Sequence, residues 1–257
     1  MKVVKLIIFL GFLISYSMNG VSKGIGETEI TTDDGIEVFQ DEKYYLLKKN
    51  VIISSDDFKI TSDNVKAKFD IDLYDITALE TKGNSSLNAI KYGINGKGNE
   101  ILINIKSEEI KVIGKNSLLN LQGTKMSSDG SIKVNNLLGS FELKGSNSNL
   151  KNDSLDIYGD YISGIFVELD GNKQLKKLEV RDKNLLKIYS ENLEMSSQKA
   201  IYDDETNIIE LFTKVKIVKG QEIITGDYGY FDTVKNSYKV KSDKTSKVKV
   251  TIKNTNE

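Results

Sequence analysis

The sequence predicts an all-β protein built from antiparallel strands. Apolar and polar residues alternate with a period of two in many short runs, as in strands with one buried and one solvated face. Turn-forming pairs such as Asp-Gly and Asn-Gly separate these runs, and such pairs typically close antiparallel hairpins. After residue 20, no window of ten or more residues keeps a helical stripe of apolar positions.

Each expected strand has one dry side. The clearest runs occupy residues 65–69, 101–106, 214–217 and 247–253. In the second run, Ile101, Ile103 and Ile105 share one side of the strand, and Asn104 and Lys106 lie on the other. The hairpin turns are expected at 54–57, 95–96, 129–130 and 170–171, where Gly, Asn, Ser and Asp supply the turn conformations.

Composition removes most catalytic chemistry. The 257 residues include no Cys, His, Trp or Pro. Without Cys and His there is no thiolate nucleophile, no Ser-His-Asp triad and no imidazole or thiolate metal site. The sequence therefore predicts a protein that is not an enzyme and that needs no cofactor or metal.

Charge is balanced, with 36 basic and 37 acidic residues. Nucleic-acid binding requires a strongly basic face, so no nucleic-acid partner is expected. The chain is 39% hydrophobic and 28% charged, which is typical of a chain that folds.

The first twenty residues resemble an export signal. Lys2 and Lys5 precede an apolar run from Leu6 to Ile14, and the small residues Ser15 and Ser17 suit a signal peptidase. We expect cleavage and a periplasmic protein, with residues 21–257 as one elongated β domain. The alternative is a retained membrane anchor over residues 3–18, although the apolar stretch is short for a span of about 20 residues.

The strands repeat as modules. The pattern Ile-x-(Ser/Thr/Gly)-(Asp/Glu) recurs at residues 30–33, 60–63, 157–160, 188–191 and 224–227. A longer match aligns DEKYYLLKKNVIISSDDFKITSDNVKAKFD (41–70) with DETNIIELFTKVKIVKGQEIITGDYGYFD (204–232). Repeated strand modules build a stacked structure, and the terminal strands of a stack keep unpaired backbone groups. We therefore expect open edges at both ends.

Two segments of the sequence resemble the OstA-like family of lipopolysaccharide transport proteins, most closely its soluble periplasmic members. The first, residues 30–70, is similar to that family's opening strands. The second, residues 196–253, is similar to its closing module. The segment 71–195 is longer than the family pattern and is expected to hold extra strand modules.

The resemblance implies an antiparallel β-jellyroll, open along one seam, whose apolar interior carries the acyl chains of lipid A. It implies a bridge for outer-membrane assembly, formed by head-to-tail strand addition between copies. The implied partners are lipopolysaccharide, an LptC-like inner-membrane protein and an LptD-like outer-membrane protein.

The residues expected to contact lipid are apolar and lie on the dry sides of the strands. They are Val51, Ile53, Phe58, Ile60, Val65, Phe69, Ile101, Ile103, Ile105, Val215, Ile217, Ile224, Phe231, Val248 and Val250. The competing interpretation is that these side chains fill an ordinary core. An acyl chain placed among them would gain about 0.8 kcal/mol per methylene buried.

Acidic residues end the repeated pattern at Asp63, Asp160, Glu191 and Asp227. Paired carboxylates can hydrolyse glycosides or bind calcium. Because these residues recur with the strand modules, we expect turn residues that bond local backbone N–H groups. The lysines near 214–219 and 239–249 are expected on a solvated face, with lipid phosphates as the alternative partner.

Two other functions stay open. The first is a membrane-anchored, LptC-like component of the same transport pathway. The second is a structural protein of stacked β modules that carries no lipid.

Overall fold

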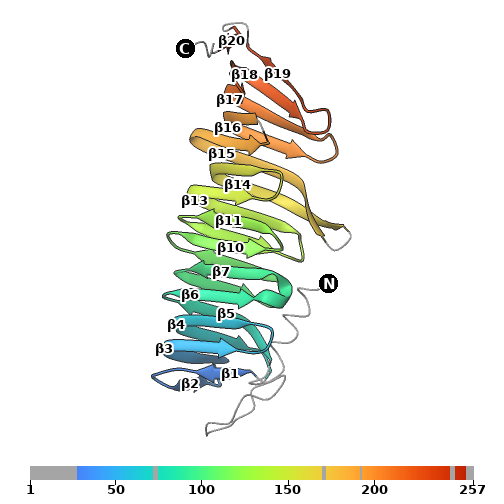
Figure 1. The fold of residues 1–257 in the computed structure, drawn as a ribbon. Helices are drawn as coiled ribbons and strands as arrows, with labels where there is room; N and C mark the ends of the chain where they lie inside the picture. The colour runs from blue at the N-terminus through green and yellow to red at the C-terminus, as the bar shows by residue number, and fades with distance from the viewer. Residues whose placement is uncertain (1–27, 72–74, 170–171, 192, 244–246, 253–257) are drawn as a thin grey trace. The chain divides into compact units, whose positions relative to one another are not determined.

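The computed structural model describes residues 28–71, 75–169, 172–191, 193–243 and 247–252. Within these ranges the chain forms twenty strands and one 3-10 turn, and every strand pairing described is antiparallel (Figure 1). The all-β antiparallel class predicted from the sequence is confirmed. None of the described residues form a helix long and apolar enough to cross a membrane. The expected export signal lies outside the described residues.

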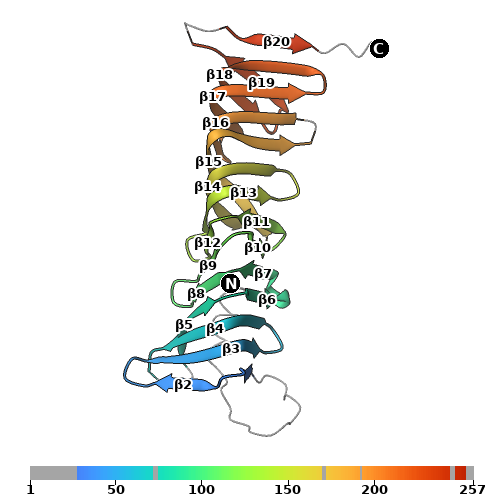
Figure 2. The ribbon, with the colours of Figure 1, turned by 90° about the vertical axis from the view of Figure 1, so that its left-hand side faces the viewer.

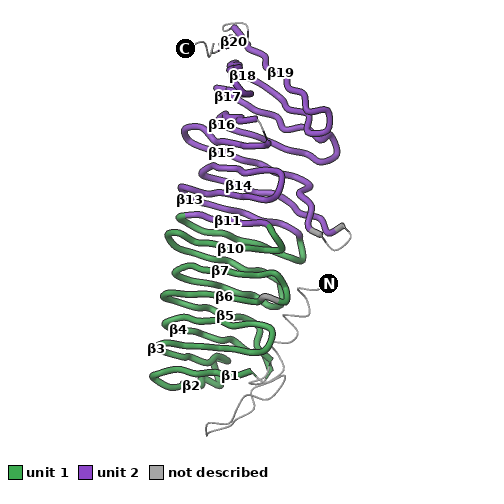
Figure 3. Tube along the Cα trace, viewed as in Figure 1, with its two compact units in different colours: residues 1–123, 129–138 green, residues 124–128, 139–257 purple. Residues whose placement is uncertain are grey.

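The chain divides into two compact units, drawn in two colours in Figure 3. The elements of unit 1 are β1 (Glu29–Thr31), β2 (Ile36–Phe39), β3 (Tyr44–Ser54), β4 (Lys59–Phe69), β5 (Ile76–Lys82), β6 (Ser85–Ala89), η1 (Ile90–Tyr92), β7 (Ile94–Gly98), β8 (Glu100–Asn104), β9 (Glu109–Ile113), β10 (Ser117–Leu121) and β12 (Ser131–Asn135).

Unit 2 is built from long strands. Its elements are β11 (Thr124–Ser128), β13 (Ser140–Lys151), β14 (Asp156–Leu169), β15 (Asn172–Ser190), β16 (Leu193–Asp203), β17 (Ile208–Lys219), β18 (Glu222–Asp232), β19 (Ser237–Lys241) and β20 (Lys249–Ile252). Figure 2 shows them following one another in chain order, except that β20 lies beside β18.

Each long strand contributes to two faces because it bends once. In β4, Ile60 and Ser62 point inward before the bend, and Val65, Ala67 and Phe69 point inward after it. The inward side therefore changes from even to odd positions at Asp63 and Asn64. A strand that changes its inward side in this way can line both walls of one interior.

We call the two walls face A and face B within each unit. In unit 1, face A is β1–β3–β4–β6–β7–β10 and face B is β2–β3–β4–β5–β8–β9–β12. In unit 2, β13–β18 contribute to both faces, β11 and β20 belong to face A, and β19 belongs to face B.

The walls touch in both units. A Cβ built at Gly96 of face A in unit 1 would lie 3.7 Å from Val112 Cγ2 of face B. In unit 2, a Cβ at Gly229 of face B would lie 3.0 Å from Val215 Cγ1 of face A. The space between the faces is therefore packed by side chains at these levels.

The internal repeat corresponds to one bent hairpin used twice. In β3–β4, the paired register skips from Lys48 to Val51, and in β17–β18 it skips from Phe212 to Val215. The skipped residues have left-handed φ values, 60° and 50° at Lys49 and Asn50, and 66° and 55° at Thr213 and Lys214. Two residues on one strand thus oppose one Asp on its neighbour, which is the arrangement of a β-bulge.

Buried hydroxyl groups complete the hydrogen bonding at the bends. Ser62 Oγ donates to backbone carbonyls beside it, with distances of 3.1 Å to Lys82 O and 3.0 Å to Gly83 O. Ser85 Oγ bonds Asn99 O at 3.1 Å, and Ser148 Oγ bonds Gly145 O at 2.7 Å. These small polar side chains thus satisfy their own hydrogen bonding on backbone carbonyls in the interior.

Close packing between neighbouring strands of face B predicts a strong effect at Gly164 in β14. A Cβ there would lie 2.2 Å from Lys177 O and 2.6 Å from Phe141 Cζ. We expect Gly164→Ala to lower the free energy of unfolding by about 1–3 kcal/mol, because backbone must move to admit the methyl group. Gly96→Ala is the matched control, since its nearest contact would be 3.5 Å from Leu119 Cδ1. Urea unfolding followed by circular dichroism compares them, and equal losses would contradict this account.

Candidate functional site

The candidate site is the apolar interior between the two faces of each unit. Along face A of unit 2, residues directly opposite one another on successive strands form one inward row, namely Leu150, Ile157, Ile188, Met195, Ile217, Ile224 and Val250. The first four are 0% exposed, Ile217 is 1% exposed, Ile224 is half-buried and Val250 is 56% exposed. The row is therefore continuous and ends uncovered among the described residues.

Unit 1 has the same organisation at its first strands. On face B, the inward row starts at Val38 and continues through Tyr45, Ala67 and Leu79 to Ile103. Val38 is 42% exposed, whereas Tyr45, Ala67 and Leu79 are buried. Interior rows thus reach an exposed apolar residue at the first strands of unit 1 and at the last strand of unit 2.

Most of the residues predicted to contact lipid lie in these interiors. Ten are buried, namely Val51, Ile53, Phe58, Ile60, Val65, Phe69, Ile101, Val215, Ile217 and Phe231. Ile103, Ile105 and Ile224 are half-buried, and Val248 and Val250 are exposed. Phe58 and Ile105 lie in turns rather than strands.

The fifteen residues do not form one cluster. The nine from Val51 to Ile105 belong to unit 1, and the six from Val215 to Val250 belong to unit 2. Ile53 and Ile60 are cross-strand partners, and so are Ile217 and Ile224. Each unit therefore has its own apolar interior with its own share of the predicted residues.

Sequence reasoning missed the central part of the interior of unit 2. Leu150, Ile157, Ile162, Val180, Leu186 and Ile188 are all 0% exposed. The signal was weak, because the bends interrupt the alternation after two or three inward positions. The patterns at Ile157–Asp160 and Ile188–Glu191 were the recognisable marks in this region.

Most side chains of the inward rows are fully buried. Residues with zero exposure have no surface that a water-sized sphere can reach. An acyl chain could enter these rows only if the two faces separated or side chains moved. The interior surface is apolar, as contact with an acyl chain requires. Separation of the two faces costs free energy, which the burial of methylene groups would have to offset.

Of the four acidic residues singled out above, Asp63, Asp160 and Asp227 lie at bends and contact neighbouring segments. Asp160 Oδ2 accepts a bond from Lys183 N–H at 3.3 Å, and Asp227 Oδ2 accepts one from Asp243 N–H at 3.0 Å. Asp63 Oδ2 accepts a bond from Asn84 Nδ2 at 3.0 Å. The expectation of turn residues that bond local backbone N–H groups is wrong for Asp160 and Asp227, because both lie within strands and their backbone donors are 23 and 16 residues away in sequence.

Glu191 differs from the other acidic positions. It lies in the turn between β15 and β16, with a φ of 41°, and not at a bend. The four-residue pattern was therefore too short to separate a bend from a hairpin turn. No group of three or more Asp or Glu residues suited to a metal ion occurs among the described residues.

A row of cations and aromatic rings crosses the outer side of face B in unit 2. Opposed residues on β13–β19 are Lys144, Tyr161, Arg181, Lys199, Phe212, Tyr228 and Lys241. Phe212 and Tyr228 meet edge to face with centroids 5.5 Å apart. Cations lie 5.7 to 6.0 Å from ring centroids at Tyr161, Phe212 and Tyr228. Such cross-strand pairs stabilise a sheet from outside.

Carboxylates flank this row. Glu179 pairs with both Arg181 and Lys199, at 2.6 and 3.2 Å, and so separates two like charges. Tyr228 Oη donates to Glu210 Oε1 at 2.5 Å. Burial, followed by the bond and charge of Glu210, raises the pKa of Tyr228 to about 12.

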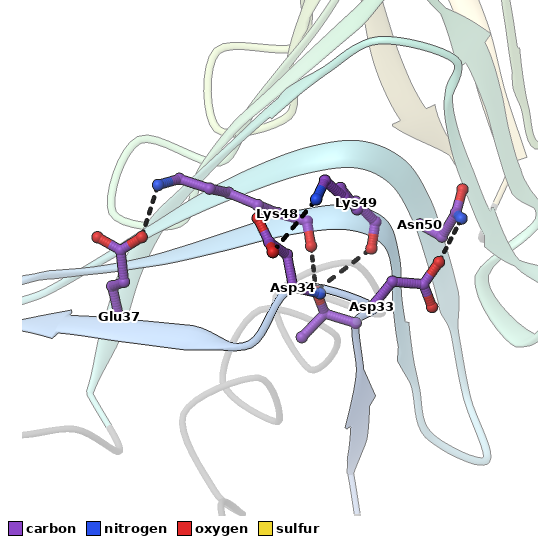
Figure 4. A network of polar contacts seen from close by, with 7 residues as sticks. Asp33, Asp34, Glu37, Lys48, Lys49 and Asn50 are labelled. Carbon is purple, nitrogen blue, oxygen red and sulfur yellow. Dashed lines mark hydrogen bonds and ion pairs between the residues drawn. The ribbon is translucent and has the colours of Figure 1, made fainter.

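The edge strands carry opposite charge. Residues 28–43 of unit 1 contain six acidic residues and one lysine, whereas the described residues of 235–252 in unit 2 contain five lysines and one aspartate. Figure 4 shows the acidic segment bound to the bend of β3, with Glu37 to Lys48 at 2.5 Å, Asp34 to Lys49 at 3.2 Å and Asp33 to Asn50 at 2.6 Å. The bond to Glu37 raises the pKa of Lys48.

Comparison with known proteins finds structural similarity but no match by sequence. No family model matches the sequence. No curated protein matches it significantly. Among solved structures, the chain is similar to LptH from Pseudomonas aeruginosa, described as the LptA homologous periplasmic component of the conserved lipopolysaccharide transport device. The TM-score is 0.42 at 12% identity, over 52% of this chain and 96% of LptH.

The bond between Tyr228 and Glu210 gives a prediction for alkaline pH. Because the folded-state pKa of Tyr228 is raised, its contribution to stability is complete below the unfolded value of about 10 and is lost as pH rises through about 12. We expect Glu210→Gln to lower that pKa, since the nearby negative charge is removed. Absorbance titration near 295 nm measures it, and subtraction of a Tyr228→Phe titration identifies the residue. An unchanged titration in Glu210→Gln would contradict this assignment.

Proposed function

We propose that the protein is a periplasmic, LptA-like transport component that carries the acyl chains of lipopolysaccharide between the faces of its β modules. The observation that carries the proposal is the inward apolar row of unit 2, which runs without a polar interruption from Leu150 to the exposed Val250. An apolar interior that ends uncovered is costly in water unless something apolar occupies or covers it.

The energetics of loading favour a lipid cargo over a small polar one. Each methylene moved from water into the interior contributes about 0.8 kcal/mol, so an acyl chain of about twelve carbons would contribute roughly 10 kcal/mol towards the cost of separating the two faces. The interior of unit 2 also has buried Ser148 and Ser197, but their hydroxyls already bond Gly145 O and Lys199 O. These two hydroxyls are therefore already used in hydrogen bonds within the protein.

End-to-end assembly is the second part of the proposal. Short strands β1 and β2 cover β3, and β19 and β20 cover β18, but their own outer edges are unpaired among the described residues. Edge strands add further strands readily. The acidic first edge and the lysine-rich last edge suit head-to-tail contact between copies, and the same edges would meet LptC-like and LptD-like partners at the two membranes.

A structural β-repeat protein without lipid is the competing function. It is favoured by one observation, the zero exposure of residues such as Ile157, Ile162 and Val180. In that case the interior is a finished core and the exposed ends serve polymerisation alone. The LptC-like alternative depends on residues 3–18, which lie outside the described structure.

Native mass spectrometry of the mature protein, from about residue 21, distinguishes these functions. The protein is purified from a host that makes lipopolysaccharide. We expect a bound mass of the lipid A type, which disappears when the host makes none. A lipid-free protein that also fails to bind added lipopolysaccharide would overturn the transport proposal and favour the structural one.

A charge at the exposed end of the inward row is expected to reduce loading. Ile217 is too deeply buried for this purpose, because an aspartate there would unfold the strand. Val250→Asp places the carboxylate at an exposed inward position, and Thr251→Asp places it on the other side of the same strand. We expect lipopolysaccharide binding to fall about tenfold in Val250→Asp and to be unchanged in Thr251→Asp, with equal thermal midpoints. Equal binding by both variants would remove Val250 from the site.

Head-to-tail assembly is expected to depend on opposite charge. We expect wild-type protein to form a ladder of oligomers in size exclusion at low salt, and reversal of two lysines in β19, Lys239→Glu with Lys241→Glu, to abolish it. Combination of these changes with Glu37→Lys in the same chain should restore part of it. Lys187→Glu with Lys216→Glu is the control, because these exposed lysines lie on inner strands of unit 2. A ladder that survives the first pair of changes would contradict assembly through this edge.

A further inference from the structure

We call the line where the strand ends of face A and face B meet, away from the bends, the seam of unit 2. At the last strands of the unit, the side chain of Tyr238 crosses this seam. Tyr238 lies on the inward side of β19 in face B, opposite the buried Phe231. Its hydroxyl bonds Glu222 Oε2 at 3.3 Å, and Glu222 is the first residue of β18, at the free end of face A. The Tyr238 side chain therefore connects face B to face A at the strand ends that lie away from the bend.

A lysine completes this contact. Lys219 is the last residue of β17 and lies opposite Glu222 in the strand register. Its Nζ lies 5.8 Å from the centre of the Tyr238 ring. Burial and the Glu222 carboxylate both raise the pKa of Tyr238, so the hydroxyl stays protonated at neutral pH. Its O–H therefore donates a hydrogen bond to the Glu222 carboxylate.

The chemistry of the seam changes along face A. Residues that share the inward row of Glu222 are Leu193, on β16, and Ile252, on β20, in addition to Lys219. Leu193 is 7% exposed, whereas Ile252 is 64% exposed. At β16 the buried Leu193 therefore closes the seam with apolar contacts, whereas at β17–β19 the seam is closed by polar, partly solvated side chains. An exposed polar bond opens at far lower cost than a packed apolar contact.

We propose that Tyr238, Glu222 and Lys219 form a releasable clasp that closes the interior of unit 2 at its last strands and admits apolar chains when it opens. The inference deepens the proposed function and rests on it. Behind the clasp lie the half-buried Ile224 and the buried Ile217, the part of the inward row where exposure begins to rise. A chain that enters here meets apolar side chains at once and follows the row towards β13.

Tyr238→Phe tests whether the hydroxyl holds the faces together. We expect amide hydrogen exchange in β19 and β20 to become about threefold to tenfold faster, as for loss of one hydrogen bond. Tyr202→Phe is the matched control, because Tyr202 belongs to the same inward row and its hydroxyl bonds Asp204, at 3.3 Å, on its own face. Equal acceleration of β19 and β20 in both variants would overturn the clasp.

A locked form tests the gating role. Since the chain has no cysteine, Glu222→Cys with Tyr238→Cys introduces the only two thiols, and a bismaleimide spacer of roughly 10 Å can join them across a gap too wide for a direct disulfide. The probe is a fluorescent dodecanoic acid. We expect uptake at least threefold faster than wild type in the unlinked variant and at least tenfold slower in the linked one.

The outcomes separate the clasp from the proposed function. Uptake by wild type with equal rates in linked and unlinked protein would overturn the clasp and leave lipid binding in place. No uptake of probe or of lipopolysaccharide by any form, including wild type, would overturn both. Faster uptake in the unlinked form and slow uptake in the linked form supports both.

Discussion

The bend in each long strand is the constraint on which the rest of the structure depends. A strand that kept a single inward side could line one wall only, and the apolar residues beyond residue 63 of β4 would face water. The bulge opposite each acidic bend shifts the inward side by one position, so both halves of the strand bury their apolar residues. Left-handed residues such as Asn50 and Lys214 make the backbone turn, and the buried Ser62 and Ser148 add hydrogen bonds to the carbonyls of Gly83 and Gly145.

In unit 1 the same bend is made by separate short strands. Between β4 and β12, backbone bonds join successive corners, from Asp63 N–H to Gly83 O at 2.9 Å and from Gly83 N–H to Asn99 O at 2.8 Å. Asn99 N–H continues to Ile113 O at 2.8 Å. These bonds connect neighbouring levels where a continuous strand would otherwise do so. The two faces thus require a bend at each strand position along the unit. The bend can lie within one continuous strand or between two short strands.

This dependence explains how much could be predicted from the sequence. Alternation is local, so the strands and the antiparallel class were predictable. The small residue and Asp of each bend are also local, which is why Ile60–Asp63 and Ile224–Asp227 were recognised as equivalent. Strand partners of the bends are not local. Nothing near Asp160 in sequence indicates Lys183 as its donor, and nothing near Glu222 indicates that Tyr238 reaches it across the seam.

The interior presents the same residues whether it is a finished core or a lipid carrier, so its chemistry alone does not decide between them. The difference lies in the cost of separating the walls. At β14 and β15 that cost is high, because Ile162, Val180 and Ile188 lose close packing on every side when the faces part. At β18–β20 it is low, because the Tyr238 hydroxyl bond to Glu222 and the Lys219 contact with the Tyr238 ring are partly solvated. Under the proposed function, an acyl chain therefore enters at the last strands, and the inner strands part stepwise after it.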